Sequence, residues 1–309
     1  MERLEFNGKA ILARAGASGP AMMICATALM AFQDSLVKLM SADLPLWQLF
    51  LVRSLIALPV LLVLSGKNSG QVLRAAFLPW ALIRSFFIVA MYIAFYAALP
   101  VLDLSVVAAL YHAAPVLIVL LSTIFLHESV RLGQAIAIGL AFIGVLIVVQ
   151  PSGNALTIAV IIPLVSALCY AIAAVMTRSN VSDAGPWALT VSINIVFVAL
   201  GGSGVAILAI VDPAPVYPFL TQAWIPLSKE IIGSLSALAV ISVGIHLALA
   251  KAYKAGPMAV VASLDYSYLL FIALWVFVFF GSVPENMVIF GSILIAASGI
   301  WLTFGNQDN

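Results

Sequence analysis

Hydrophobic residues run along the chain in long, nearly unbroken stretches that are separated by short polar or proline-containing segments. A helix needs about 20 mostly apolar residues to cross the roughly 30 Å hydrocarbon core of a bilayer. Ten stretches approach that length, although Arg53 and Arg84 interrupt the second and the third. The predicted transmembrane helices are residues 19–40, 46–65, 77–98, 104–126, 132–149, 156–176, 187–211, 231–252, 257–281 and 286–304.

The fourth and the ninth stretches resemble two copies of one segment. Residues 96–130 and 253–284 each contain a small-residue turn with a proline, a long apolar helix and a short polar break. A fourth helix that matches a ninth implies two halves of five helices, and an odd number of spans inserts the second half upside down. Such inverted repeats are typical of transporters.

We therefore predict an all-α integral membrane protein with ten transmembrane helices in two inverted five-helix repeats. The predicted units are a cytoplasmic N-terminal tail at 1–18, a first repeat at 19–150 and a second repeat at 156–304.

Composition and charge support a membrane location. The chain is 64% hydrophobic and 8% charged, whereas about a quarter of the residues in soluble domains are charged. The net charge of +1 offers no basic surface for nucleic acid. Most Lys and Arg residues fall on one side if the N-terminus is cytoplasmic, so we expect a multi-pass protein of a bacterial-type cytoplasmic (inner) membrane with both termini inside.

Several chemistries lack their motifs. The sequence has no G-x-x-x-x-G-K-[ST] loop for ATP. His112, His127 and His246 fall on separate segments, so we predict neither a metal nor a cofactor. An intramembrane aspartyl hydrolase that uses Asp34 and Asp265 remains an alternative, because Asp103 is better explained as a helix N-cap. A channel is the other alternative, although the spans offer no ring of like charges.

The motifs resemble those of the drug/metabolite transporter superfamily, EamA-like branch. The similarity rests on residues 126–130 (LHESV), the lead-in at 96–99 (YAAL) and residues 280–284 (FGSVP) within the ten-helix duplicated layout. It implies that helices one to four and six to nine surround a central cavity, while five and ten pack outside. His127 stands where the family often has glycine, and Ser282 where the second half often repeats the glutamate.

A subgroup that includes S-adenosylmethionine and riboflavin uptake proteins is similar at 34–38 (DSLVK), Arg53, Arg84, 252–254 (AYK) and 265–266 (DY). The resemblance implies secondary active transport of a small metabolite by alternating access. Amino acids, amines, S-adenosylmethionine-like and riboflavin-like compounds all fit, and the transport direction and a role for protons stay open. The expected partners are this substrate and the lipid bilayer, for a monomer or a homodimer.

Charged residues within the spans are the first candidates for a functional site. An unpaired ion near the bilayer centre costs at least about 2.5 to 3.5 kcal/mol, so such residues should pair or line water. Helical spacing and depth predict one cluster on the first two helices and a second cluster on helices three, eight and nine, in which an Arg84–Asp265 ion pair acts as a gate. In both cases a purely structural ion pair is the alternative. The clusters are Asp34, Lys38 and Arg53, and Arg84, His246 and Asp265.

Aromatic residues supply the rest of the predicted site. Aromatic residues on the third, fourth and ninth helices are expected to wall a pocket for a planar or cationic substrate, through stacking or cation–π contact. They are Phe87, Tyr92, Phe95, Tyr96, Tyr111, Tyr266, Tyr268, Phe271 and Trp275, among which Tyr92, Tyr111 and Tyr268 are the ones to test. His112, beside Tyr111, is grouped with them as a substrate-binding or gating residue.

Two features predict helix packing. Pro115 should bend the fourth helix. The pairs Ala135 with Gly139, and Gly233 with Ala237, should allow close helix approach.

Overall fold

The computed structural model describes residues 2–40, 44–98, 107, 110–149, 161–178, 184–211, 217–281 and 286–304. The elements among these residues are helices joined by turns, and a short 3₁₀ helix at Gly66–Asn68 precedes α3. The helices are α1 (Glu2–Met40), α2 (Leu46–Leu64), α3 (Ser69–Ala76), α4 (Pro79–Ala98), α6 (Ala114–Phe125), α7 (Leu132–Val149), α8 (Ile161–Arg178), α9 (Pro186–Val211), α10 (Pro218–Thr221), α11 (Lys229–Ala255), α12 (Met258–Asp265), α13 (Ser267–Phe280) and α14 (Asn286–Phe304).

The predicted fold class is confirmed: this is an all-α membrane protein. Within the described part of the chain, seven helical segments are long and apolar enough to cross a membrane, and shorter apolar helices lie at Ala114–Phe125 and Leu132–Gly144. The backbone of α1 is helical from Glu2 onward, so the polar N-terminal segment continues the first span at Gly19–Met40 as helix. The boundaries of the two predicted repeats stay predictions.

Helix contacts are almost unchanged when the two halves of the chain are exchanged. In that exchange α1, α2, α4, α6 and α7 correspond to α8, α9, α11, α13 and α14. The α1–α11 contact then corresponds to α8–α4, and α1–α13 corresponds to α8–α6. The α2–α9 and α7–α14 pairs map onto themselves. Two repeats related by a two-fold axis produce this pattern.

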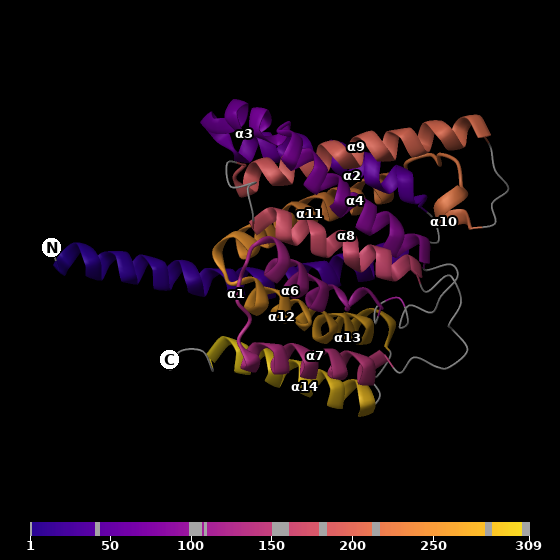
Figure 1. The fold of residues 1–309 in the computed structure, drawn as a ribbon. Coiled ribbons are helices and arrows are strands. Elements are labelled where there is room, and N and C mark those ends of the chain that lie inside the picture. Colours follow the sequence, from indigo (N-terminus) through magenta and orange to yellow (C-terminus); the bar gives the residue numbers. More distant parts are fainter. Residues whose placement is uncertain are drawn as a thin grey trace.

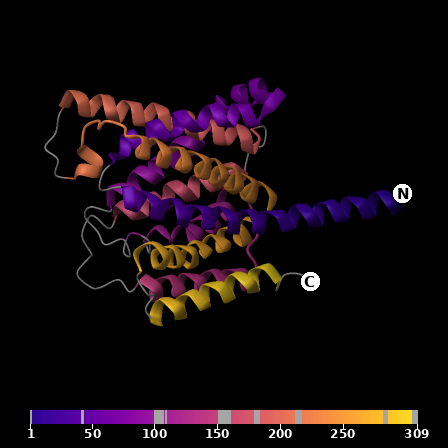
Figure 2. The same cartoon turned by 180° about the vertical axis from the view of Figure 1, so that it is seen from behind.

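The pair α7 and α14 lies side by side at one edge of the bundle, as both views show (Figure 1, Figure 2). This is the position that the family resemblance implied for the fifth and tenth helices. The N-terminal end of α1 and the C-terminal end of α14 lie at the same end of the bundle. An even number of membrane crossings places both ends of a chain on the same side of the membrane.

Glycines allow close backbone contact at three helix pairs. A Cβ added at Gly201 of α9 would lie 2.8 Å from the Leu51 backbone nitrogen on α2. At Gly144 of α7 it would lie 3.0 Å from the Gly291 oxygen on α14, and at Gly19 of α1 3.0 Å from the Gly256 nitrogen. Small residues serve this purpose in membrane bundles, where packing rather than hydrophobic exclusion holds helices together.

The prediction that two small-residue pairs allow close helix approach is wrong about where the helices approach. Nothing lies within 4 Å of a Cβ placed on Gly139 or Gly233, and Ala135 and Gly139 are exposed. The close contact of the fifth helix uses Gly144 instead. Spacing identified a helix face with small residues but could not tell whether that face meets protein or lipid.

The fourth and ninth spans are each interrupted near their middle. In the fourth, a turn at His112 and Ala113 precedes α6, whose first turn contains Pro115. In the ninth, α12 ends at Asp265 and α13 begins at Ser267. Pro115 therefore starts a new helix, where its missing N–H costs nothing, and does not bend a continuous one as predicted.

Candidate functional site

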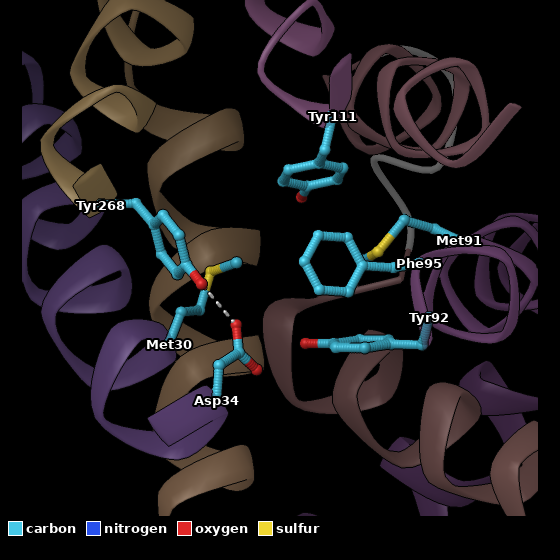
Figure 3. A pocket seen from close by; sticks show the side chains of 7 residues that line it. All are labelled: Met30, Asp34, Met91, Tyr92, Phe95, Tyr111 and Tyr268. Carbon is cyan, nitrogen blue, oxygen red and sulfur yellow. Dashed lines mark hydrogen bonds between the residues drawn. The ribbon is translucent and has the colours of Figure 1, made fainter. Parts of the chain in front are cut away.

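The site is a cavity between α1 and α4 of the first half and α13 of the second (Figure 3). Its empty volume is about 290 Å³, including the open space at its mouth. The wall is aromatic and thioether-rich, with a single carboxylate. The lining residues are Met30, Asp34, Met91, Tyr92, Phe95, Tyr111 and Tyr268.

The Asp34 carboxylate is held by tyrosines from both halves of the chain. The Tyr96 hydroxyl on α4 donates to Oδ1 at 3.2 Å. The Tyr268 hydroxyl on α13 donates to Oδ2 at 2.9 Å (Figure 3). Tyr268 reaches Asp34 because α13 starts a new helix at Ser267 and places Tyr268 in its first turn. The break in the ninth span thus positions one wall of the cavity.

The two helix breaks meet at the centre of the bundle. The His112 ring, in the turn before α6, lies 5.3 Å from the Tyr268 ring and 6.3 Å from the Tyr266 ring, centroid to centroid. Interrupted helices inside a membrane occur where neighbouring protein or a cavity satisfies the freed backbone groups. These breaks border the cavity through Tyr111 and Tyr268.

The first predicted charge cluster is only partly assembled. Arg53 is 1% exposed and lies over the Phe197 ring, with its Cζ atom 4.5 Å from the ring centroid. The structure records no ion pair between Arg53 and Asp34, whose oxygens instead accept from tyrosines. Lys38 is exposed near the end of α1 and does not line the cavity.

The second predicted cluster is brought into one region without the predicted ion pair. Arg84 Nε donates to Thr177 Oγ1 at 2.9 Å, and Asp265 lies within hydrogen-bonding range of Tyr170. Tyr170 in turn accepts from the Tyr253 hydroxyl at 3.2 Å. Both charged residues are buried. In this conformation Arg84 bonds to a threonine and Asp265 lies beside a tyrosine. We had expected Arg84 and Asp265 to pair with each other.

His246 lies beside the aromatic wall of the cavity. Its ring is perpendicular to that of Tyr92, with centroids 6.2 Å apart, and 6.3 Å from Phe197. His246 is buried, and so is His112. Among the described residues, no three His, Cys, Asp or Glu side chains group as metal ligands would.

One end of the bundle, which we call the Glu128 end, is closed by a polar network of Glu128, Arg178, Lys254 and Met258. Arg178 Nε and Glu128 Oε1 form an ion pair at 3.1 Å. Glu128 Oε2 accepts from the Met258 N–H at 3.3 Å, and Arg178 Nη1 donates to the Lys254 carbonyl at 2.9 Å. The network joins the segment after α6 to the ends of α8 and α11 and to the start of α12.

The opposite end, the Gln48 end, is closed by residues 217–228. Gln48 exchanges two hydrogen bonds with the Ile225 backbone, at 2.9 and 3.0 Å, and the Trp47 indole donates to the Leu220 carbonyl at 3.0 Å. Phe219 packs edge-on against Tyr96, with centroids 5.9 Å apart. The ends are separated by the length of α11, 27 residues or about 40 Å.

Some lining residues were not predicted as site residues. Met30 and Met91 complete the cavity and were not expected there, whereas Phe95 and Tyr96 belong to the predicted aromatic wall: Phe95 lines the cavity and Tyr96 holds Asp34. The signal was available: Met30 lies four residues before Asp34 and Met91 four before Phe95, so each pair shares a helix face. Side chains that share a face with a buried carboxylate are candidates for the same cavity.

An all-α bundle with two exchangeable halves and a partly buried carboxylate between them is typical of a multi-pass membrane transporter. Residues 17–150 match the model of the EamA-like transporter family. The match covers somewhat less than half of the chain and shows that this part is similar to a family of transporters. The predicted resemblance to the EamA-like family is confirmed over residues 17–150, while the subgroup of S-adenosylmethionine and riboflavin uptake proteins stays a prediction.

Curated relatives match along most of the chain. The pseudopaline exporters CntI of Pseudomonas aeruginosa strains UCBPP-PA14 and PAO1 are each 26% identical over 291 residues, which is 93% of this chain and 96% of the relative. A solved crystal structure with 16% sequence identity superposes with a TM-score of 0.74, covering 95% of this chain and 99% of that one. At that identity it supports the fold alone.

Proposed function

We propose that the protein is a secondary transporter that carries a small amine-bearing metabolite across a bacterial-type cytoplasmic membrane by alternating access. The observation that carries the proposal is the Asp34 carboxylate, held by tyrosines of both halves in an aromatic-walled cavity. A carboxylate attracts an ammonium group, and the faces of tyrosine rings add cation–π attraction. Both termini are proposed to be cytoplasmic.

Alternating access is supported by the two closed ends. The cavity lies between the Glu128 end and the Gln48 end, and each end is held by a few polar contacts between segments of opposite halves. Rocking of one half against the other would release one set of contacts while the other set stays closed. Substrate bound between Asp34 and Tyr268 would touch both halves in either state.

The relatives' names describe exporters, so export is the direction to test first. The wild-type protein, reconstituted in liposomes, is expected to exchange a radiolabelled amine or amino acid against the same unlabelled compound. Asp34→Asn should lower the apparent affinity about tenfold to a hundredfold, because a hydrogen bond to a charged group contributes about 1.5 to 3 kcal/mol. Glu230→Gln, which removes an exposed carboxylate from the first turn of α11, is the matched control.

A second variant separates charge from hydrogen bonding. Tyr268→Phe removes the hydroxyl that donates to Asp34 but keeps the ring, so it should weaken binding less than Asp34→Asn. If no amine or amino acid exchanges through the wild-type protein, or if Asp34→Asn behaves like Glu230→Gln, the proposal is wrong.

A further inference from the structure

A second group of buried polar side chains surrounds Phe197 and Tyr92, outside the cavity lining. Arg53 of α2 is 1% exposed and His246 of α11 is 2% exposed. The Arg53 Cζ atom lies 4.5 Å from the Phe197 centroid, and the His246 ring lies within 6.3 Å of both aromatic rings. Two helices, α2 and α11, therefore bring one guanidinium and one imidazole to the Phe197 ring of α9.

These groups have donors and acceptors without protein partners. Arg53 Nε and Nη2, and His246 Nε2, form no hydrogen bond among the described residues. Arginine stays charged in nearly any environment, and buried donors without acceptors are unfavourable. Asp34 attracts Arg53 electrostatically, but its oxygens accept from Tyr96 and Tyr268, and the two guanidinium nitrogens stay without an acceptor.

We propose that Arg53 and His246 form a carboxylate-binding subsite, so that the transported molecule is an amino-carboxylate with its amine at Asp34 and its carboxylate at Arg53. The inference rests on the proposed function and narrows its substrate class. A planar guanidinium offers two parallel N–H donors that match the two oxygens of a carboxylate. A substrate carboxylate also supplies acceptors for the two guanidinium nitrogens that have none.

Tyr92 links the subsite to the cavity. Its side chain lines the cavity and lies within electrostatic range of both Asp34 and Arg53. Its ring also lies 5.7 Å from that of Phe197. Tyr92 therefore lies between the Asp34 cavity and the ring beneath the guanidinium.

The first experiment needs no ligand. Thermal unfolding of the purified full-length protein is compared with that of Arg53→Met, which replaces the buried guanidinium by an apolar chain of similar length, and of Arg74→Met, a control at an exposed arginine. Removing a guanidinium whose buried donors have no acceptor should raise the melting temperature by at least about 2 °C over wild type, while Arg74→Met should leave it unchanged. If Arg53→Met lowers the melting temperature, Arg53 is a structural residue and the subsite is wrong.

The second experiment tests recognition with matched probes. L-Phenylalanine, L-histidine and L-lysine are each compared with the decarboxylated amine and the deaminated acid for their effect on the melting temperature. For at least one of the three amino acids, the melting temperature of the wild type should rise more with the amino acid than with its amine or its acid. Arg53→Met should respond equally to the amino acid and the amine, and Asp34→Asn equally to the amino acid and the acid. Arg53→Lys keeps the charge without the paired donors and should lie between Arg53→Met and wild type.

The inference is overturned if no amino acid stabilises the wild type more than its decarboxylated amine does, or if Arg53→Met keeps that difference. Exchange in liposomes that depends on Asp34 but not on the carboxylate would overturn this inference alone. Absence of exchange would overturn the proposed function as well.

Discussion

Neutralising Glu128 is expected to loosen the Glu128 end of the bundle. One carboxylate oxygen pairs with Arg178 at 3.1 Å and the other accepts the Met258 N–H at 3.3 Å. Arg178 also donates to the Lys254 carbonyl. A Glu128→Gln substitution keeps the shape and can still accept the Met258 N–H, so it removes mainly the ion pair between the two halves.

The size of the effect follows from exposure. The Arg178 and Glu128 side chains are 31% and 28% exposed, so solvent screens their attraction. Pairs of this kind contribute about 0.2 to 1 kcal/mol. An equilibrium between closed and open forms of this end would therefore shift by up to about fivefold.

Maleimide labelling measures the shift. Ala255, partly buried at the end of α11, is replaced by cysteine after Cys25→Ser and Cys169→Ser remove both native thiols. The labelling rate should rise up to about fivefold with Glu128→Gln, similarly with Arg178→Gln, and no further in the double variant, because paired residues are not additive. Glu230→Gln, at the other end of α11, is the control. Strictly additive effects, or unchanged labelling in both single variants, would refute the reasoning.

Three further variants test local packing. His127 has a left-handed φ of 54°, which costs about 1 kcal/mol or more outside glycine, so His127→Gly should raise the melting temperature, and a fall would contradict the strain. Gly204→Ala should lower the melting temperature by several degrees, because the new Cβ would lie 2.3 Å from the Trp47 ring. Gly139→Ala, whose Cβ would have no atom within 4 Å, should leave the melting temperature unchanged. Gln48→Ala should speed proteolysis within residues 217–228, since it removes both bonds to the Ile225 backbone; an unchanged cleavage rate would mean that Gln48 does not hold this segment.

The sequence predicted the helices well because hydropathy alone marks a span. It missed the break at Tyr266, which carries neither glycine nor proline and ends α12 through turn hydrogen bonds to Ser263 and Leu269. It showed only that His127 stands where the family often has glycine and did not predict the left-handed φ of 54° there. That residue follows the end of α6 as Gly281, with a φ of 65°, follows the end of α13.

For the site, the predicted topology gave the depth of each residue in the membrane but not the direction in which its side chain points. Tyr92, Tyr111 and Tyr268 line one cavity with Asp34, and their role in binding stays a prediction. Arg84 and Asp265 are both buried without forming an ion pair. Equal depth on two helices does not determine how each helix is rotated about its axis, and so does not determine whether the two side chains face each other. Only the packing of α8, which supplies Thr177 and Tyr170, determines their partners.

The exchangeable helix contacts have a consequence for how a substrate is oriented. Matching Trp47 to Trp187, which begin the equivalent helices α2 and α9, places Asp34 opposite Ala174 and Arg53 opposite Ile193, both buried and apolar. The helix scaffold is duplicated, but Asp34 and Arg53 have no charged counterpart in the second half. A molecule held between these unlike halves therefore keeps one polarity throughout the transport cycle, and an artificial tandem of two first halves would lose that distinction while retaining the helix pairings.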